Sequence, residues 1–210
     1  MRVLLAGATG LVGTQVLQQL LDDPRCSAVV APSRRALPRS DARLLNPVLD
    51  FATLPTEAPW WAVDAAISAL GTTAKLAGSP EAFRQIDRGY PLAIARAVQA
   101  HGCQVFALNS AASANPRSPV FYSKVKGELE QDLRALQFAS LCLVRPGLIG
   151  GERSERRPGE HLASVVLGAL APVLPRAWRI NPAEHIAAAL VEAALAPRPG
   201  VRIVTAAELA

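Results

Sequence analysis

The chain has 210 residues, of which 50% are apolar, and a formal net charge of +5 from 22 basic and 17 acidic residues. This length fits one domain with one core, and the apolar content excludes a disordered chain. The basic residues are almost all arginines and form no stripe interleaved with aromatic residues, so nucleic acid is not an expected partner.

Apolar runs of strand length alternate along the chain with segments that have a helical spacing of apolar residues. Strands are predicted over residues 2–6, 28–31, 47–51, 63–70, 103–110, 139–145 and 201–205. Helices are predicted over residues 10–21, 80–100, 122–136 and 182–195. Because strands that alternate with helices form parallel sheets, we expect an α/β fold with a doubly wound, Rossmann-like parallel sheet in a single domain over residues 1–210.

Residues 146–180 interrupt this alternation and are rich in glycine, proline and arginine. An insertion near the carboxyl ends of the strands is where α/β domains build substrate pockets. We therefore predict a substrate pocket or lid in this segment. A surface excursion, or a contact within a homo-oligomer, is the alternative.

A glycine loop joins the first predicted strand to the first predicted helix. Glycine permits a tight turn and lets the backbone approach a pyrophosphate, while a helix N-terminus offers free N–H groups and partial positive charge. The sequence therefore predicts a dinucleotide site here. The expected contacts are Gly7, Thr9, Gly10, Leu11, Val12 and Gly13.

The residues that follow the second predicted strand favour NADP(H) over NAD(H). An acidic residue about 20 positions beyond the glycine loop would bind the ribose 2′-hydroxyl of NAD, but Ser33, Arg34 and Arg35 stand there instead. An arginine fork binds a 2′-phosphate well; ordinary surface arginines are the alternative. Asp50 is predicted to meet the adenine, or else to be an ordinary turn residue.

The end of the fourth predicted strand is expected to flank the cofactor through Ala69, Leu70 and Gly71. Parallel strands present their carboxyl ends at one edge of the sheet, where dinucleotides bind. Turns of this composition are common, so an ordinary strand-end turn is the alternative.

Tyr122 and Lys126 lie four residues apart, on one face of a predicted helix, and Ser110 ends the strand before it. A nearby ammonium helps a phenol to give up its proton, which suits Tyr122 to proton transfer with a carbonyl or alcohol. Lys126 would also hold the nicotinamide ribose, and Ser110 would bind the substrate oxygen. The alternative is a chance spacing on a solvated helix face.

Two sets of residues carry a resemblance to known proteins. The first resembles the short-chain dehydrogenase/reductase superfamily and consists of Gly7, Gly10, Gly13, Asp50, Ser110, Tyr122, Lys126 and Arg145-Pro146-Gly147. The second resembles the atypical branch that includes the HIV Tat-interactive protein 2 family and consists of Leu70-Gly71-Thr72-Thr73, Phe121-Tyr122, Val125-Lys126-Gly127-Glu128 and Arg145-Pro146-Gly147. The resemblance implies a Rossmann fold, NADP(H) binding with Pro146 among the contacts, and a Ser/Tyr/Lys triad.

One departure from the family pattern concerns the segment after Ser110. It has alanines where relatives often carry Ser or Gly, so Ser113 is a second candidate for the role of Ser110.

Together these features predict an NADP(H)-dependent oxidoreductase that acts on a small carbonyl or alcohol. A non-catalytic NADP(H)-binding sensor or scaffold is the first alternative. A nucleotide-sugar epimerase or dehydratase is the second, although such enzymes usually have a longer substrate domain than the 65 residues that follow Arg145.

The cysteines, histidines and apolar stretches indicate which metal sites, membrane segments and cellular location to expect. The three cysteines form no C-x-x-C pair and the three histidines are scattered, so neither a zinc ribbon, a redox dithiol nor another metal site is expected. The longest apolar stretch, residues 162–174, is too short to span a bilayer, and the start of the chain lacks the pattern of a signal peptide. These features predict a cytoplasmic protein whose partner is a small molecule.

Overall fold

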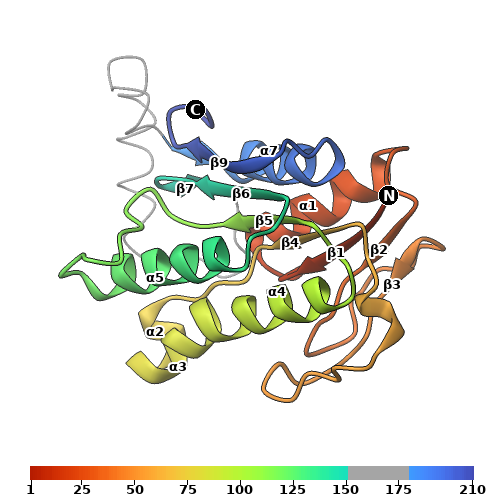
Figure 1. Ribbon diagram of the computed structural model, residues 1–210, viewed down its shortest axis with the longest axis horizontal. Helices are drawn as coiled ribbons and strands as arrows, with labels where there is room; N and C mark the ends of the chain where they lie inside the picture. The colour runs from red at the N-terminus through yellow and green to blue at the C-terminus, as the bar shows by residue number, and fades with distance from the viewer. Residues whose placement is uncertain (151–179) are drawn as a thin grey trace.

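A parallel sheet organises the chain in the computed structural model, which describes residues 1–150 and 180–210 (Figure 1). Within these ranges the main sheet has seven strands in the order β3-β2-β1-β4-β5-β6-β9, and every neighbouring pair is parallel. The strands are β1 Arg2–Ala6, β2 Ala28–Val30, β3 Leu44–Leu45, β4 Ala65–Ser68, β5 Val105–Asn109, β6 Ser140–Arg145 and β9 Gly200–Thr205. The predicted α/β class and doubly wound Rossmann-like sheet are confirmed.

Helices and short elements connect these strands. The α-helices are α1 Leu11–Asp22, α2 Ala74–Ala77, α3 Pro80–Arg84, α4 Tyr90–Ala100, α5 Phe121–Ala135 and α7 Ala183–Leu195. A 3₁₀ turn, η1, covers Pro59–Trp61, and a π-helical turn, η2, covers Gln85–Gly89. Two short strands, β7 Ile149–Gly150 and β8 Asn181–Pro182, pair on either side of residues 151–179.

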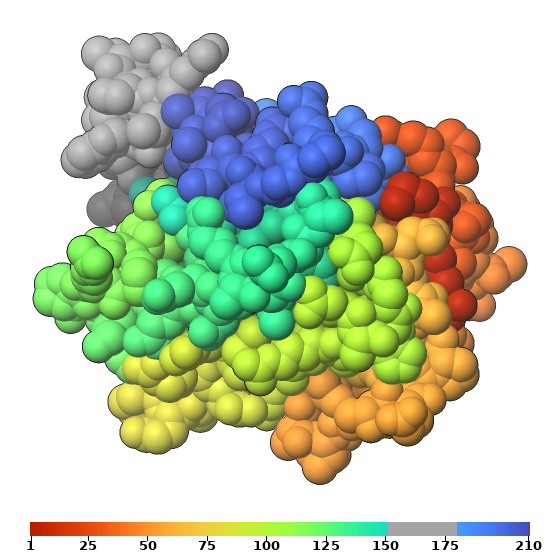
Figure 2. Space-filling view, viewed as in Figure 1, coloured from red at the N-terminus to blue at the C-terminus, as the bar shows by residue number. Residues whose placement is uncertain are grey.

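The helices cover the two faces of the sheet in separate layers (Figure 1). Strand side chains alternate between the faces, so Val3 and Leu5 of β1 join the apolar core under α1 and α7, whereas Leu4 and Ala6 join the core under α4 and α5. In the space-filling view the blue region of α7 and β9 lies on one side and the yellow-to-green region of α3–α5 on the other (Figure 2).

The order of the strands creates a switch point between β1 and β4. The chain first runs outward from β1 through β2 to β3, and then returns to β4 on the other side of β1. In open parallel sheets the crevice at such a point, beyond the carboxyl ends of the strands, is where ligands bind. The glycine loop after β1 and the segment after β4 meet at this switch point, where a Cβ at Gly7 would lie 2.7 Å from the backbone carbon of Ala69.

Two predicted elements differ from those observed. The third strand is Leu44–Leu45, and of predicted residues 47–51 only Val48 makes a bridge, to Ser33. Pro47 has no N–H to donate to the Ala31 oxygen, so the regular pairing stops after Leu45, and the Asn46 side chain donates to that oxygen instead. The predicted helix over residues 80–100 is observed as one continuous helical stretch, in which the π-helical turn η2 separates α3 from α4. Most of the predicted pocket segment, residues 146–180, lies outside the described residues.

Candidate active site

The glycine loop packs tightly against α1 and the end of β4. Gly7 has φ +92°, and a Cβ there would lie 2.7 Å from the backbone carbon of Ala69. A Cβ at Gly13 would lie 1.9 Å from the carbonyl oxygen of Gly7. These two glycines are therefore required by the packing of the protein itself.

Gly10 differs from the other two glycines because its exposed side is open. A Cβ there would meet one protein atom within 4 Å, the oxygen of Gly7 at 3.4 Å, which is an ordinary contact. Gly10 begins α1 without a side-chain cap, and the first turn carries no acidic residue. Among the described residues, no acceptor meets the N–H groups of Leu11, Val12 and Gly13. This end of α1 therefore fits a phosphate group.

Three predicted cofactor residues follow β2, and the structure gives them two roles. Ser33 is buried, donates its hydroxyl hydrogen to the Arg35 oxygen at 2.6 Å and accepts from Asn46 Nδ2 at 2.7 Å. It therefore shapes the loop. Arg34 and Arg35 are exposed, and neither has a carboxylate partner in the described ranges. Both guanidinium groups are thus available to an anion.

Asp50 lies in the loop that follows β3. Its carboxylate accepts the Ala52 N–H at 2.9 Å, and its backbone oxygen accepts the Thr53 N–H at 3.1 Å. Its side chain is exposed beyond this turn.

The segment after β4 connects the glycine loop to the predicted catalytic helix. The Ala69 N–H donates to the Ala6 oxygen at 2.8 Å, and Gly7 contacts Ala69 from the same side. Two residues later, a Cβ at Gly71 would lie 3.7 Å from Lys126 Nζ. The structure therefore brings the glycine loop, residues 69–71 and Lys126 to one edge of the sheet.

Lys126 is a buried cation with a buried partner. Its Nζ lies 2.7 Å from Asp87 Oδ1, and the two side chains are 5% and 1% exposed. The other oxygen of Asp87 accepts the Thr72 N–H at 2.8 Å. An ammonium has three N–H donors, and Asp87 is the one ion-pair partner of Lys126 among the described residues.

Tyr122 lies one helical turn before Lys126, in the first turn of α5. The residue is 40% exposed, and its ring packs against the buried Phe83, with 5.9 Å between ring centroids. No described residue forms a hydrogen bond with its hydroxyl group.

Ser110 has a different neighbourhood. Its hydroxyl donates to Glu130 Oε1 at 2.5 Å, and Arg145 Nε donates to the same oxygen at 2.9 Å. The hydrogen bond with Glu130 raises the pKa of Arg145, so that the guanidinium stays charged. Ser113 is exposed in the loop after β5. The structure thus joins Ser110 to Glu130 and Arg145.

Pro146 follows β6 at the same edge of the sheet. It is buried, and its oxygen accepts the Ala112 N–H at 2.8 Å. This bond ties the loop after β6 to the loop after β5.

The Ser110→Ala variant is expected to lose about 1.5–3 kcal/mol of unfolding free energy, because it removes a hydrogen bond to a buried carboxylate. Urea denaturation followed by circular dichroism measures this loss. The exposed Ser113→Ala is the matched control and is expected to unfold like the parent. Unchanged stability in Ser110→Ala, together with lost turnover, would contradict a structural role for this hydroxyl.

Sequence reasoning missed Asp87 and Glu130, although both carry a signal. Asp87 follows Phe83 by four residues and therefore lies on an apolar helical stripe. A carboxylate buried there is costly unless it is paired. Glu130 follows Lys126 by four residues on the buried face of α5. Their partners come from other elements, so spacing along the chain does not identify them.

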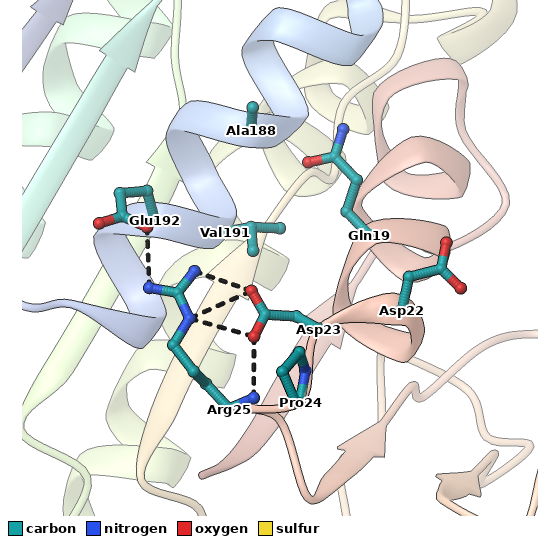
Figure 3. Close-up of a pocket in the computed structure, with 8 residues that line it drawn as sticks. All are labelled: Gln19, Asp22, Asp23, Pro24, Arg25, Ala188, Val191 and Glu192. Carbon is teal, nitrogen blue, oxygen red and sulfur yellow. Dashed lines mark hydrogen bonds and ion pairs between the residues drawn. The ribbon is translucent and has the colours of Figure 1, made fainter.

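A groove of about 520 Å³ lies at the other end of α1, beside α7 (Figure 3). Arg25 bridges Asp23 at 2.7 Å and Glu192 at 3.0 Å across it, and lowers the pKa of Asp23 through their hydrogen bonds. None of the predicted site residues lines this groove. Arg25 thus pairs with two of the acidic side chains, and the Asp22 carboxylate accepts from Gln18 Nε2 at 2.6 Å, so we assign the groove a role in joining α1 to α7.

Cys26, Cys103 and Cys142 are free and buried, and burial raises the pKa of each thiol. Thiols of this kind are poor nucleophiles. In residues 1–150 and 180–210, no three His, Cys, Asp or Glu side chains gather as metal ligands. None of the helices in these ranges combines the length and apolar character needed to cross a bilayer.

The chain is similar in sequence to two groups of proteins. It is 35% identical over 205 residues to "Protein fmp52, mitochondrial" of Aspergillus fumigatus, which covers 92% of this chain and 86% of that protein. It is 36% identical over 180 residues to Protein HTATIP2 of Rattus norvegicus, with 84% and 72% covered. No family model matches the chain.

Solved structures share the fold. MoeE5 in complex with UDP-glucose and NAD has a TM-score of 0.74 at 17% identity, with 97% of this chain and 75% of that chain covered. The PhqB reductase domain from Penicillium fellutanum has a TM-score of 0.68 at 21% identity, with 97% and 66% covered. The likeness establishes a Rossmann-like fold.

The sequence relatives correct one expectation. Several FMP52 relatives are named mitochondrial, which contradicts the expected cytoplasmic location. Isolated cysteines indicate only that the protein needs no oxidising compartment. They do not distinguish one reducing compartment from another, so the expectation had too little support.

Proposed function

Because the chain belongs to the family of the FMP52 and HTATIP2 proteins, within the atypical short-chain dehydrogenases/reductases, we propose that it is an NADP(H)-dependent oxidoreductase. Its proposed substrate is a small carbonyl compound or alcohol. The observation that carries the proposal is the buried Lys126 ammonium beside Gly71, one turn from the exposed Tyr122 and at the same edge as the open end of α1.

The residues at this edge fit a dinucleotide. The free N–H groups at the start of α1 suit the pyrophosphate, and the bare side of Gly10 leaves room for it. Arg34 and Arg35 suit a 2′-phosphate, because both are exposed without carboxylate partners in the described part of the chain. Lys126 has N–H donors left for the hydroxyl groups of a ribose.

A bound nicotinamide supplies hydride chemistry at this edge. The chain supplies the proton, since the Tyr122 hydroxyl is exposed and free to donate to a carbonyl oxygen or to accept from an alcohol. Lys126 lies one turn further along α5, where its ammonium is proposed to hold the cofactor ribose. Ser113, exposed in the loop after β5, is the proposed partner of the substrate oxygen, since Ser110 is bound to Glu130.

A second function, an NADP(H)-binding sensor without turnover, is favoured by one observation. The Ser110 hydroxyl donates to a buried carboxylate, so one predicted member of the triad is committed to the fold. A sensor needs the dinucleotide site but no proton donor. Turnover by the parent protein distinguishes the two functions.

NADPH is expected to bind about ten-fold or more tightly than NADH, because losing a charge-assisted phosphate contact costs about 1.5–3 kcal/mol. Calorimetric titration measures both affinities. Arg34→Ala and Arg35→Ala are expected to weaken NADPH binding and to leave NADH binding unchanged. Arg198→Ala, which changes an exposed arginine before β9, is the control. Equal affinities for the two cofactors would refute the NADP(H) assignment.

A further inference from the structure

We propose that Asp87 is a positioning residue for Lys126, whose ammonium it holds beside Gly71 so that a dinucleotide ribose can be bound there. The inference rests on the proposed function, because it concerns how the same site binds its cofactor. Three elements meet at this point: η2 supplies Asp87, the segment after β4 supplies Gly71 and Thr72, and α5 supplies Lys126.

The π-helical turn η2 contains Asp87 and sets its position. The Tyr90 N–H donates to the Gln85 oxygen, five residues earlier, so the helix widens by one residue at this point. Such turns occur mainly as single widenings within α-helices and are frequent at functional sites. Asp87 is fully buried in the middle of η2, whereas its neighbours Ile86 and Arg88 remain partly exposed.

Stability alone gives no reason to bury this pair. Removing two charges from water is costly, and well-packed apolar residues of similar size often stabilise a protein equally well. The Asp87 carboxylate also accepts the backbone N–H of Thr72 at 2.8 Å, and this bond helps to hold it in position. The ammonium, by contrast, keeps N–H donors that no described residue accepts.

Asp87 is the carboxylate available for this task. Glu130 lies one turn beyond Lys126 on α5, but it accepts hydrogen bonds from Ser110 and Arg145. Glu128 and Asp132 on the same helix pair with Arg88, and Glu128 also pairs with Arg84. The direction of the Lys126 ammonium is therefore set by Asp87.

The test is a double-mutant cycle on NADPH affinity, measured by calorimetric titration of the full chain. Asp87→Asn keeps the size of the side chain and an acceptor oxygen but removes the charge. It is expected to weaken NADPH binding about ten-fold or more, the scale of a lost charge-assisted contact. In a Lys126→Met background the same change is expected to have no further effect, because the group that it orients is gone.

A purely structural role makes a different prediction. In that case Asp87→Asn lowers the melting temperature while the folded protein keeps its NADPH affinity, or weakens binding equally in both backgrounds. Either result overturns the proposal. Asp132→Asn is the matched control, since it removes another carboxylate from the contact between η2 and α5, paired with Arg88 at 2.7 Å. It is expected to bind NADPH like the parent.

Two further results complete the test. If Asp87→Asn does not fold, Asp87→Glu decides, because it keeps the ion pair but moves the carboxylate by one methylene. Weaker NADPH binding by folded Asp87→Glu supports the proposal, and parental affinity overturns it. A parent protein that fails to bind NADPH refutes the proposed function itself. A parent that binds NADPH without coupling in the cycle refutes only the role of Asp87.

Discussion

Tyr122→Phe is expected to bind NADPH as tightly as the parent and to lose turnover by about 10²-fold or more, the scale of general acid catalysis. The ring of Tyr122 packs against Phe83 with 5.9 Å between centroids, and a phenylalanine ring keeps this contact. Only the exposed hydroxyl is removed. NADPH oxidation followed by absorbance with a panel of aldehydes, ketones and quinones measures the loss.

Tyr90→Phe is the matched control for this experiment. Tyr90 is the other of the two tyrosines, and its ring packs against Phe51 with 5.8 Å between centroids. It is expected to turn over like the parent. Equal turnover by Tyr122→Phe and the parent would refute the proposed mechanism. Tight NADPH binding by a parent without turnover on the whole panel would favour the sensor.

Gly10→Val is expected to abolish NADPH binding while the protein stays folded. The Cβ would make one ordinary contact, 3.4 Å from the Gly7 oxygen, so the fold accommodates it. The two methyl groups would stand over the free N–H groups at the start of α1, where a pyrophosphate would approach. Circular dichroism tests whether the variant is folded, and cofactor fluorescence tests whether it binds NADPH.

Gly13→Ala provides the contrast within the same loop. Its Cβ would lie 1.9 Å from the Gly7 oxygen, so this single methyl group forces the loop away from α1. We expect Gly13→Ala to lower the melting temperature clearly, and Gly10→Val to leave it near the parental value. Normal NADPH binding by folded Gly10→Val would remove the glycine loop from the cofactor site.

Local patterns in the sequence were sufficient for most elements of the fold. The glycine turn, the start of the first helix and the i,i+4 relation of Tyr122 and Lys126 each depend on a few consecutive residues. The predicted strand over residues 201–205 is observed as β9, Gly200–Thr205, at the edge of the sheet. The third strand was misplaced because apolar residues lie on both sides of Pro47, and Pro47, which has no N–H, ends the regular pairing after Leu45.

The sequence by itself therefore determined the doubly wound fold, the glycine loop and the helix that carries Tyr122 and Lys126. Only the tertiary structure decided that Ser110 binds Glu130, 20 residues away, and that Lys126 pairs with Asp87 across two elements. The reason is physical. Periodicity reports which face of an element is buried, whereas a buried charge pairs with whichever opposite charge the packing of the sheet and helices brings nearest.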